Sequence, residues 1–66
     1  MYKAQMLVTD TGLFIALPGL FETEERAALF AAREVIATRC PCRIVHLDYD
    51  RRGCLTVETS VSTLNP

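Results

Sequence analysis

Residues 43–62, RIVHLDYDRRGCLTVETSVS, decide the fold because they form two strand-like segments around a tight turn. The turn residues 50–53, DRRG, fit a type I turn that ends with glycine in the left-handed region. This turn pairs Asp50 with Cys54 and defines the flanking strands as Arg43–Asp50 and Cys54–Ser62. The pattern therefore predicts an antiparallel hairpin over these residues.

The register set by this turn divides the hairpin into an apolar face and a polar face. Six apolar side chains share the face that is expected to pack against a helix: Val45, Leu47, Tyr49, Leu55, Val57 and Val61. The opposite face is mostly polar and holds Ile44, His46, Asp48, Asp50, Cys54, Thr56, Glu58 and Ser60. The turn chemistry and the hydrophobic pattern thus support the same register.

A second hairpin is predicted within residues 2–17. The strand Tyr2–Thr9 alternates, with Tyr2, Ala4, Met6 and Val8 on the core face and Lys3, Gln5 and Thr9 on the other. A short apolar strand, Leu13–Leu17, stops at Pro18. The turn permits two registers, which pair Leu13 with either Thr9 or Asp10. The first leaves Leu7, Leu13, Ile15 and Leu17 facing away from the helix, and the second leaves Leu7, Phe14 and Ala16 there.

One helix, Glu24–Arg39, is predicted between the hairpins. Thr23 is a suitable N-cap, and Pro41 disfavours helical geometry at the residue before it. At about 100° per residue, the face expected to contact the sheet holds Ala28, Leu29, Ala32, Val35 and Ile36. Phe30 is expected on the far side with Glu34 and Ala37. The predicted core between sheet and helix contains Val45, Leu47, Val57, Leu29 and Ile36.

These elements predict a single small α+β domain over residues 1–66, with the order ββαββ and an antiparallel sheet of about four strands. Half of the residues are hydrophobic and 23% are charged, which favours a packed globule over disorder. The net charge of −1 argues against a strongly basic nucleic-acid binder. The longest uncharged run, 11–21, is too short to span a bilayer, so no membrane partner is expected. Three cysteines in this spacing favour reduced thiols and a cytoplasmic location.

The residue types of Cys40, Cys42, Cys54 and His46 would suit a zinc or catalytic site, but their predicted positions argue against one. The predicted register sets Cys42 opposite Ser62 and about eight strand residues, or roughly 26 Å, from Cys54, so these thiols cannot share a metal or a disulfide. His46 is expected to face Glu58 across the hairpin, about 13 Å from either strand cysteine. We therefore expect no metal, no cofactor and no catalytic site.

Three surfaces are candidates for binding. An acidic set on the polar hairpin face, Asp48, Asp50 and Glu58, could imitate a row of phosphates. An apolar set with no evident place in the core could form a protein interface: Leu7, Phe14, Ile15 and Phe30. The basic hairpin tip, Arg51 and Arg52, could enter a nucleic-acid groove, although the neighbouring aspartates weaken its attraction to phosphate.

Two hairpins around one helix, formed by residues 2–17, 24–39 and 43–62, resemble the small anti-CRISPR proteins of phages and other mobile elements. Several members of that group have mixed α/β folds and act by occupying a surface of a CRISPR effector complex. The resemblance lies in the architecture, so it carries no functional residue over to this chain. It implies a non-enzymatic inhibitor in the host cytoplasm whose partner is a nucleoprotein complex.

Two other functions compete with this hypothesis. A small nucleic-acid-binding or transcription-regulatory domain would use Arg51 and Arg52 at the tip together with Lys3 and Arg43. A structural homodimer subunit would be joined through the sheet face that points away from the helix.

Overall fold

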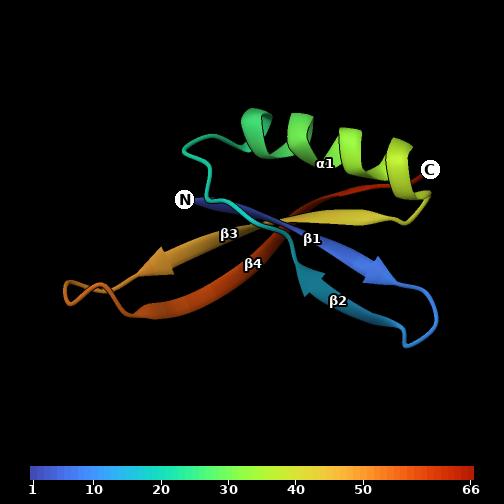
Figure 1. Cartoon of the computed structure of the whole chain (residues 1–66). Coiled ribbons are helices and arrows are strands. Elements are labelled where there is room, and N and C mark those ends of the chain that lie inside the picture. The colour runs from blue at the N-terminus through green and yellow to red at the C-terminus, as the bar shows by residue number, and fades with distance from the viewer.

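A computed structural model describes all residues 1–66 and contains one four-stranded sheet and one helix (Figure 1). The elements in chain order are β1 (Tyr2–Val8), β2 (Leu13–Ala16), α1 (Glu24–Thr38), β3 (Cys42–Tyr49) and β4 (Leu55–Leu64). The strands lie in the order β2-β1-β3-β4, and every neighbouring pair is antiparallel. The predicted α+β class and the ββαββ order are confirmed.

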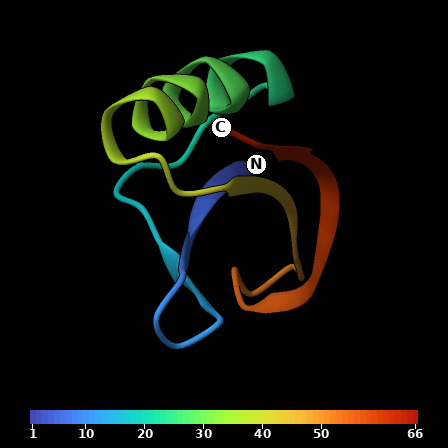
Figure 2. The ribbon, with the colours of Figure 1, turned by 90° about the vertical axis from the view of Figure 1, so that its right-hand side faces the viewer.

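The helix lies across one face of the sheet, and both hairpins curl away from it (Figure 2). We call the opposite surface, which the helix does not cover, the free sheet face. The molecule measures 38 × 25 × 18 Å and exposes 4569 Å². A typical monomer of this mass exposes about 4,200 Å², so the curled hairpins present more surface than a compact globule would.

The helix begins and ends through local chemistry. Thr23 is the N-cap, and its Oγ1 accepts a hydrogen bond of 3.2 Å from the Arg26 N–H. The helix ends before Arg39, which adopts a left-handed conformation with φ of 60° and donates its N–H to the Val35 carbonyl. The start was predicted correctly, and the end lies one residue earlier than predicted.

The helix contacts the sheet through small side chains. Ala27, Ala31 and Val35 are buried, whereas Leu29 and Ile36 are 60% and 74% exposed. The predicted contact face is therefore wrong by about 100°, or one residue position. Alanines let the helix backbone lie close to the strands, and a leucine or isoleucine at these positions would hold it further away.

Phe21 explains this rotation of the helix. Its backbone forms a bridge with Tyr2, with N–H···O distances of 2.9 and 2.7 Å, at the edge of β1. Its ring packs against Phe30 with 5.4 Å between the ring centroids. Phe30 is thus half-buried against the core, which corrects its predicted place on the far side of the helix.

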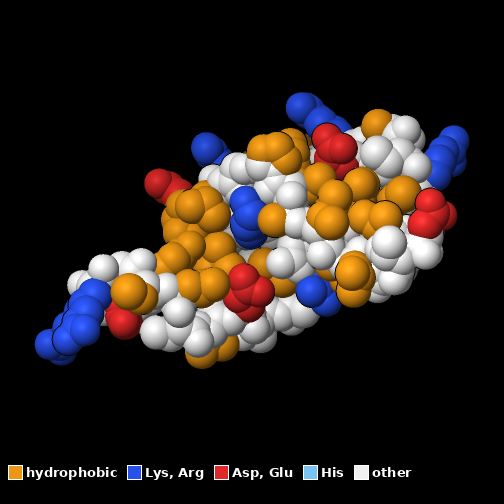
Figure 3. All heavy atoms as spheres, turned by 60° about the horizontal axis from the view of Figure 1, so that its bottom comes forward, with side chains coloured by type: hydrophobic (Ala, Val, Ile, Leu, Met, Phe, Trp, Pro, Cys, Tyr) orange, Lys and Arg blue, Asp and Glu red, His pale blue; other side chains and the backbone are white.

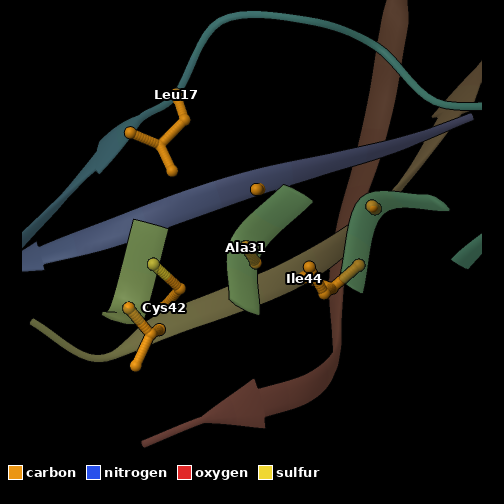
Figure 4. Packing of buried hydrophobic residues seen from close by; sticks show 7 residues of the cluster. Leu17, Ala31, Cys42 and Ile44 are labelled. Carbon is orange, nitrogen blue, oxygen red and sulfur yellow. The ribbon is translucent and has the colours of Figure 1, made fainter. Parts of the chain in front are cut away.

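The helix covers the opposite face of β3 from the one predicted. Ile44 and Cys42 are completely buried and belong to the core beneath the helix (Figure 4). Val45 and Leu47 are also buried but lie outside that core cluster, because successive side chains of a strand point to opposite faces. The pairing of Ala4 with Ile44 sets this choice, since it places both residues under the alanines of the helix.

The C-terminal hairpin follows the predicted register only near its turn. The Asp50 N–H donates to the Cys54 carbonyl, and Tyr49 pairs with Leu55 as expected. Two register shifts, between Asp48 and Tyr49 and between Ile44 and Val45, then place extra residues in β4. As a result Ile44 pairs with Ser62, and Val57 is exposed rather than in the core.

The first hairpin has neither of the predicted registers. Val8 pairs with Leu13, and the four residues between them form the turn. The N–H of Gly12, whose φ is 71°, donates to the Val8 carbonyl at 2.8 Å. Leu7 pairs with Phe14, so these two side chains share the free sheet face, as the second predicted register required.

The helix is too short and too polar to cross a lipid bilayer, and it is the only helix of the chain.

Candidate interaction surface on the free sheet face

The free sheet face carries apolar side chains at both of its ends, with polar side chains between them (Figure 3). One end is the hairpin of β3 and β4, where Tyr49 pairs with Leu55. The other end is the hairpin of β1 and β2, where Leu7 pairs with Phe14. The two pairs differ in how much of their apolar surface reaches solvent.

Tyr49 and Leu55 form the more exposed pair. The two side chains are 44% and 47% exposed, and their direct pairing places them side by side. They share a face with Leu47, which is buried two residues away along β3. This group forms an apolar surface beside the turn, where Tyr49 and Leu55 are paired and a register shift separates them from the next pair, Asp48 and Val57.

Leu7 and Phe14 are only half-buried, and a guanidinium covers the aromatic ring. Arg43 Cζ lies 3.9 Å from the centroid of the Phe14 ring, within the range of a cation–π interaction. The Arg43 Nε–H donates to Gln5 Oε1 at 2.7 Å and so fixes the guanidinium there. This end of the free sheet face therefore presents a charged group above an aromatic one.

The other two residues of the predicted apolar set lie elsewhere. Ile15 pairs with Met6, whose side chain packs on the core, so Ile15 lies on the helix side of the sheet at the β2 edge, 45% exposed. Phe30 packs on Phe21. The structure thus brings together Leu7 and Phe14 but not Ile15 or Phe30.

The three predicted carboxylates do not form one acidic surface. Asp48 pairs with Val57 and Glu58 with Leu47, so these two carboxylates lie on opposite faces of the sheet. Asp50 shapes the turn, because its Oδ1 accepts hydrogen bonds of 2.9 Å from the N–H groups of both Arg52 and Cys54. A row of carboxylates that imitates phosphates is not formed.

His46 does not face Glu58 as expected. It pairs with Thr59, and its Nδ1 lies 3.5 Å from Asp48 Oδ1 on the same strand. The imidazole ring also packs against Tyr2 with 4.9 Å between centroids. The ring is thus held between an aromatic side chain and a carboxylate on the helix side of the sheet.

The basic tip extends from one end of the molecule (Figure 1). Arg51 and Arg52 are exposed in the turn between β3 and β4, and neither guanidinium forms an ion pair. The tip adjoins Tyr49 and Leu55, so the apolar pair has two positive charges at its border.

The sequence predicts Tyr49 and Leu55 on the face that packs against the helix, and this is wrong, because they lie on the free sheet face. A helix of 15 residues spans roughly 22 Å, and the strands next to the turn continue beyond the part of the sheet that it covers. Their position next to the turn was the signal in the sequence that could have indicated exposure. Residues beside a hairpin turn lie furthest from the helix, which covers only the centre of the sheet.

All three cysteines are free thiols in different surroundings. Cys42 is completely buried, and burial raises the pKa of its thiol, with smaller contributions in the same direction from the charges of Glu34 and Cys40. A raised pKa keeps the thiol protonated and unreactive near neutral pH. Cys54 is exposed beside the turn.

We expect Cys42→Ser to destabilise the fold by about 1–3 kcal/mol, because a hydroxyl would replace a thiol among buried apolar side chains. Cys54→Ser is the matched control and should change the free energy of unfolding by less than about 0.5 kcal/mol. Urea unfolding measures both values, and equal stabilities of the two variants would contradict the placement of Cys42 in the core.

The surface contains no pocket, and no group of three or more histidine, cysteine or acidic side chains is positioned to hold a metal ion. Comparisons with protein-family models, with curated proteins and with solved structures find no match to this chain.

Proposed function

We propose that this protein is a non-enzymatic inhibitor that covers a surface of a larger protein or nucleoprotein complex with its free sheet face. The observation that supports the proposal best is the exposed pair of Tyr49 and Leu55 on the free sheet face. Apolar side chains that are held in a fixed place and remain uncovered are typical of protein interfaces.

The composition of this surface also fits a protein partner. Tyrosine is enriched among interface residues that dominate binding energy, and a paired strand position holds its ring with little loss of conformational freedom. Arg51 and Arg52 border the pair, and Glu58 lies opposite Leu47 on the same face. Such charges at the rim of an apolar centre orient the partner and reduce binding to wrong surfaces.

The partner class follows from the architectural resemblance to anti-CRISPR proteins, which implies a CRISPR effector complex in the host cytoplasm. Steric blocking needs an exposed surface of suitable chemistry and no reacting group. Burial raises the pKa of the Cys42 thiol and keeps it protonated. These features support an inhibitor that acts by occupancy.

Exchanging Tyr49 and Leu55 for aspartate should abolish capture of the partner. Interface anchors can each carry about 2 kcal/mol or more, which is about thirtyfold in affinity for one residue. The measurement is capture by immobilised protein from host lysate, followed by mass spectrometry and by titration of the purified partner. Inhibition of target cleavage by that purified complex then tests the inhibitor activity itself.

Ile36→Asp is the matched control, since Ile36 is exposed on the outward face of the helix. It should retain the partner fully, and circular dichroism should show that all variants fold. Loss of the partner with Ile36→Asp, together with its retention by the Tyr49 and Leu55 variants, would move the interaction to the helix and contradict the proposal.

A second function is favoured by one observation, the absence of ion pairs at Arg51 and Arg52. Free guanidinium groups on a projecting β-hairpin can bind phosphate in a nucleic-acid groove. This function demands binding to DNA that weakens steeply with salt and is lost in Arg51→Ala with Arg52→Ala. The inhibitor proposal expects no such binding.

A further inference from the structure

The two edges of the sheet differ strongly in their protection. β2 forms one edge with only four residues, and Pro18 follows it closely. Beyond β2, the chain continues along β1, where Leu17 donates its N–H to Ala4 and Phe21 bridges Tyr2. Short strands, proline and covering segments are the usual means of preventing further strand pairing.

β4 forms the other edge with ten residues and none of these covers. No proline, lysine or arginine occurs in Leu55–Leu64, and Glu58 is its only charged residue. Five of its positions are valine or threonine, which favour extended structure. A long, nearly uncharged edge strand presents a row of unpaired backbone groups to a further strand.

The register shifts of β4 leave its middle regular. The shifts fall between Leu55 and Val57 and between Ser60 and Ser62, whereas Val57–Ser60 pairs with β3 without interruption. Bulges bend an edge strand and limit the length that a second strand can follow. A further strand would therefore be centred on this regular segment.

We propose that β4 pairs antiparallel with β4 of a second copy, which joins the two sheets into one of eight strands. A two-fold axis through Thr59 sets Thr59 against its own copy and Glu58 against Ser60, within the regular segment Val57–Ser60. This register keeps the two Glu58 carboxylates from standing directly opposite one another, as they would if the axis passed through Glu58.

The occupant is a second copy because the strand is complementary to itself. Because β4 carries a single charged residue, pairing with itself brings little electrostatic repulsion. The two-fold arrangement pairs the β4 edges of both copies with each other, so no further copy can add there. Every pair in the sheet is already antiparallel, and the new pair continues that pattern. This inference concerns the strand edge and does not rest on the proposed inhibitor function, which concerns the free sheet face.

Sedimentation equilibrium of the full chain from about 1 μM to about 1 mM tests the proposal. We expect the mass to rise from the 7.4 kDa of one chain toward twice that value. Thr59→Lys and Val57→Lys should each weaken dimerisation at least tenfold, because edge lysines oppose strand pairing. Ile36→Lys on the helix is the matched control and should change the dissociation constant less than twofold.

Disulfide trapping tests which residues of β4 lie opposite one another in the dimer. In a Cys40→Ser, Cys54→Ser background, Thr59→Cys places two thiols on residues whose Cα atoms are about 4.5–5.5 Å apart in the dimer, a separation that a disulfide can bridge. Under mild oxidation it should form a covalent dimer at least ten times faster than Thr63→Cys, which lies at the end of the strand.

A monomer across the whole concentration range would overturn the proposal. A dimer that is weakened by Ile36→Lys but not by the β4 lysines would also overturn it, because the helix would then be the interface. Larger oligomers without a dimer, or a foreign peptide bound along β4 of a monomer, would contradict the two-fold self-pairing.

Discussion

Replacing Ile44 with alanine is expected to unfold the protein or bring it close to unfolding at room temperature. Ile44 is the largest completely buried side chain, and it lies in the core beneath the helix. Such truncation costs about 2–5 kcal/mol, because apolar contacts are lost and a cavity remains. A domain of this size has a total stability of roughly 3–10 kcal/mol, so one change removes much of it.

Ile36→Ala is the matched control, because the same side chain is removed from a position that is 74% exposed. It should change the free energy of unfolding by less than about 0.5 kcal/mol. Urea unfolding monitored by circular dichroism gives both values. A larger loss for Ile36→Ala than for Ile44→Ala would show that the helix packs through the face predicted from the sequence, and would contradict the structure.

Introducing leucine at both Ala27 and Ala31 should destabilise the protein about as strongly as Ile44→Ala. Both alanines are completely buried, and their size lets the helix lie close to β1 and β3. Overpacking costs about 1–3 kcal/mol per site, so the pair should cost about 2–6 kcal/mol if the two effects add. The strain arises because the helix must move away from Ala4 and Ile44 below it.

Ala37→Leu is the control on the exposed face of the same helix. It should be nearly neutral, since leucine and alanine have similar helix propensities. Comparable stability of this variant and of the Ala27→Leu with Ala31→Leu protein would show that the helix has room above the sheet. That outcome would contradict the close approach that defines the fold.

The sequence predicted those parts of the fold that local chemistry determines. The turn before Gly53 forms because Asp50 accepts two backbone N–H groups and glycine adopts a φ of 81°. The helix begins at Thr23 for an equally local reason. These features involve residues within four positions of one another, so a single sequence contains the information for them.

The faces of β3 could not be predicted because each of them contributes two buried apolar side chains. Ile44 and Cys42 lie on one face and Val45 and Leu47 on the other, and all four are buried. The choice between them depends on the pairing of Ala4 with Ile44, about forty positions apart in the chain, and on the register shifts of β4. Such long-range contacts leave no periodic signal in either segment.

The same error displaced the candidate site. The predicted register sets Tyr49 and Leu55 on the face toward the helix, whereas the structure has them exposed on the free sheet face. A hairpin without register shifts would have Asp48 and Glu58 on the same face. The shift between Leu55 and Val57 in β4 instead sets these two carboxylates on opposite faces. The sequence thus showed which apolar and charged residues the hairpin contains, but not which of them share a face of the sheet.

The central claim, that the free sheet face binds a protein partner, can be tested by site-specific crosslinking in the host cell. A photo-crosslinking amino acid would be placed at position 55 in one variant and at position 36 in another, both exposed in the free protein. We expect position 55 to give one heavier covalent product with a host protein, and position 36 to give none. A crosslinked host protein at position 36 and none at position 55 would contradict the claim.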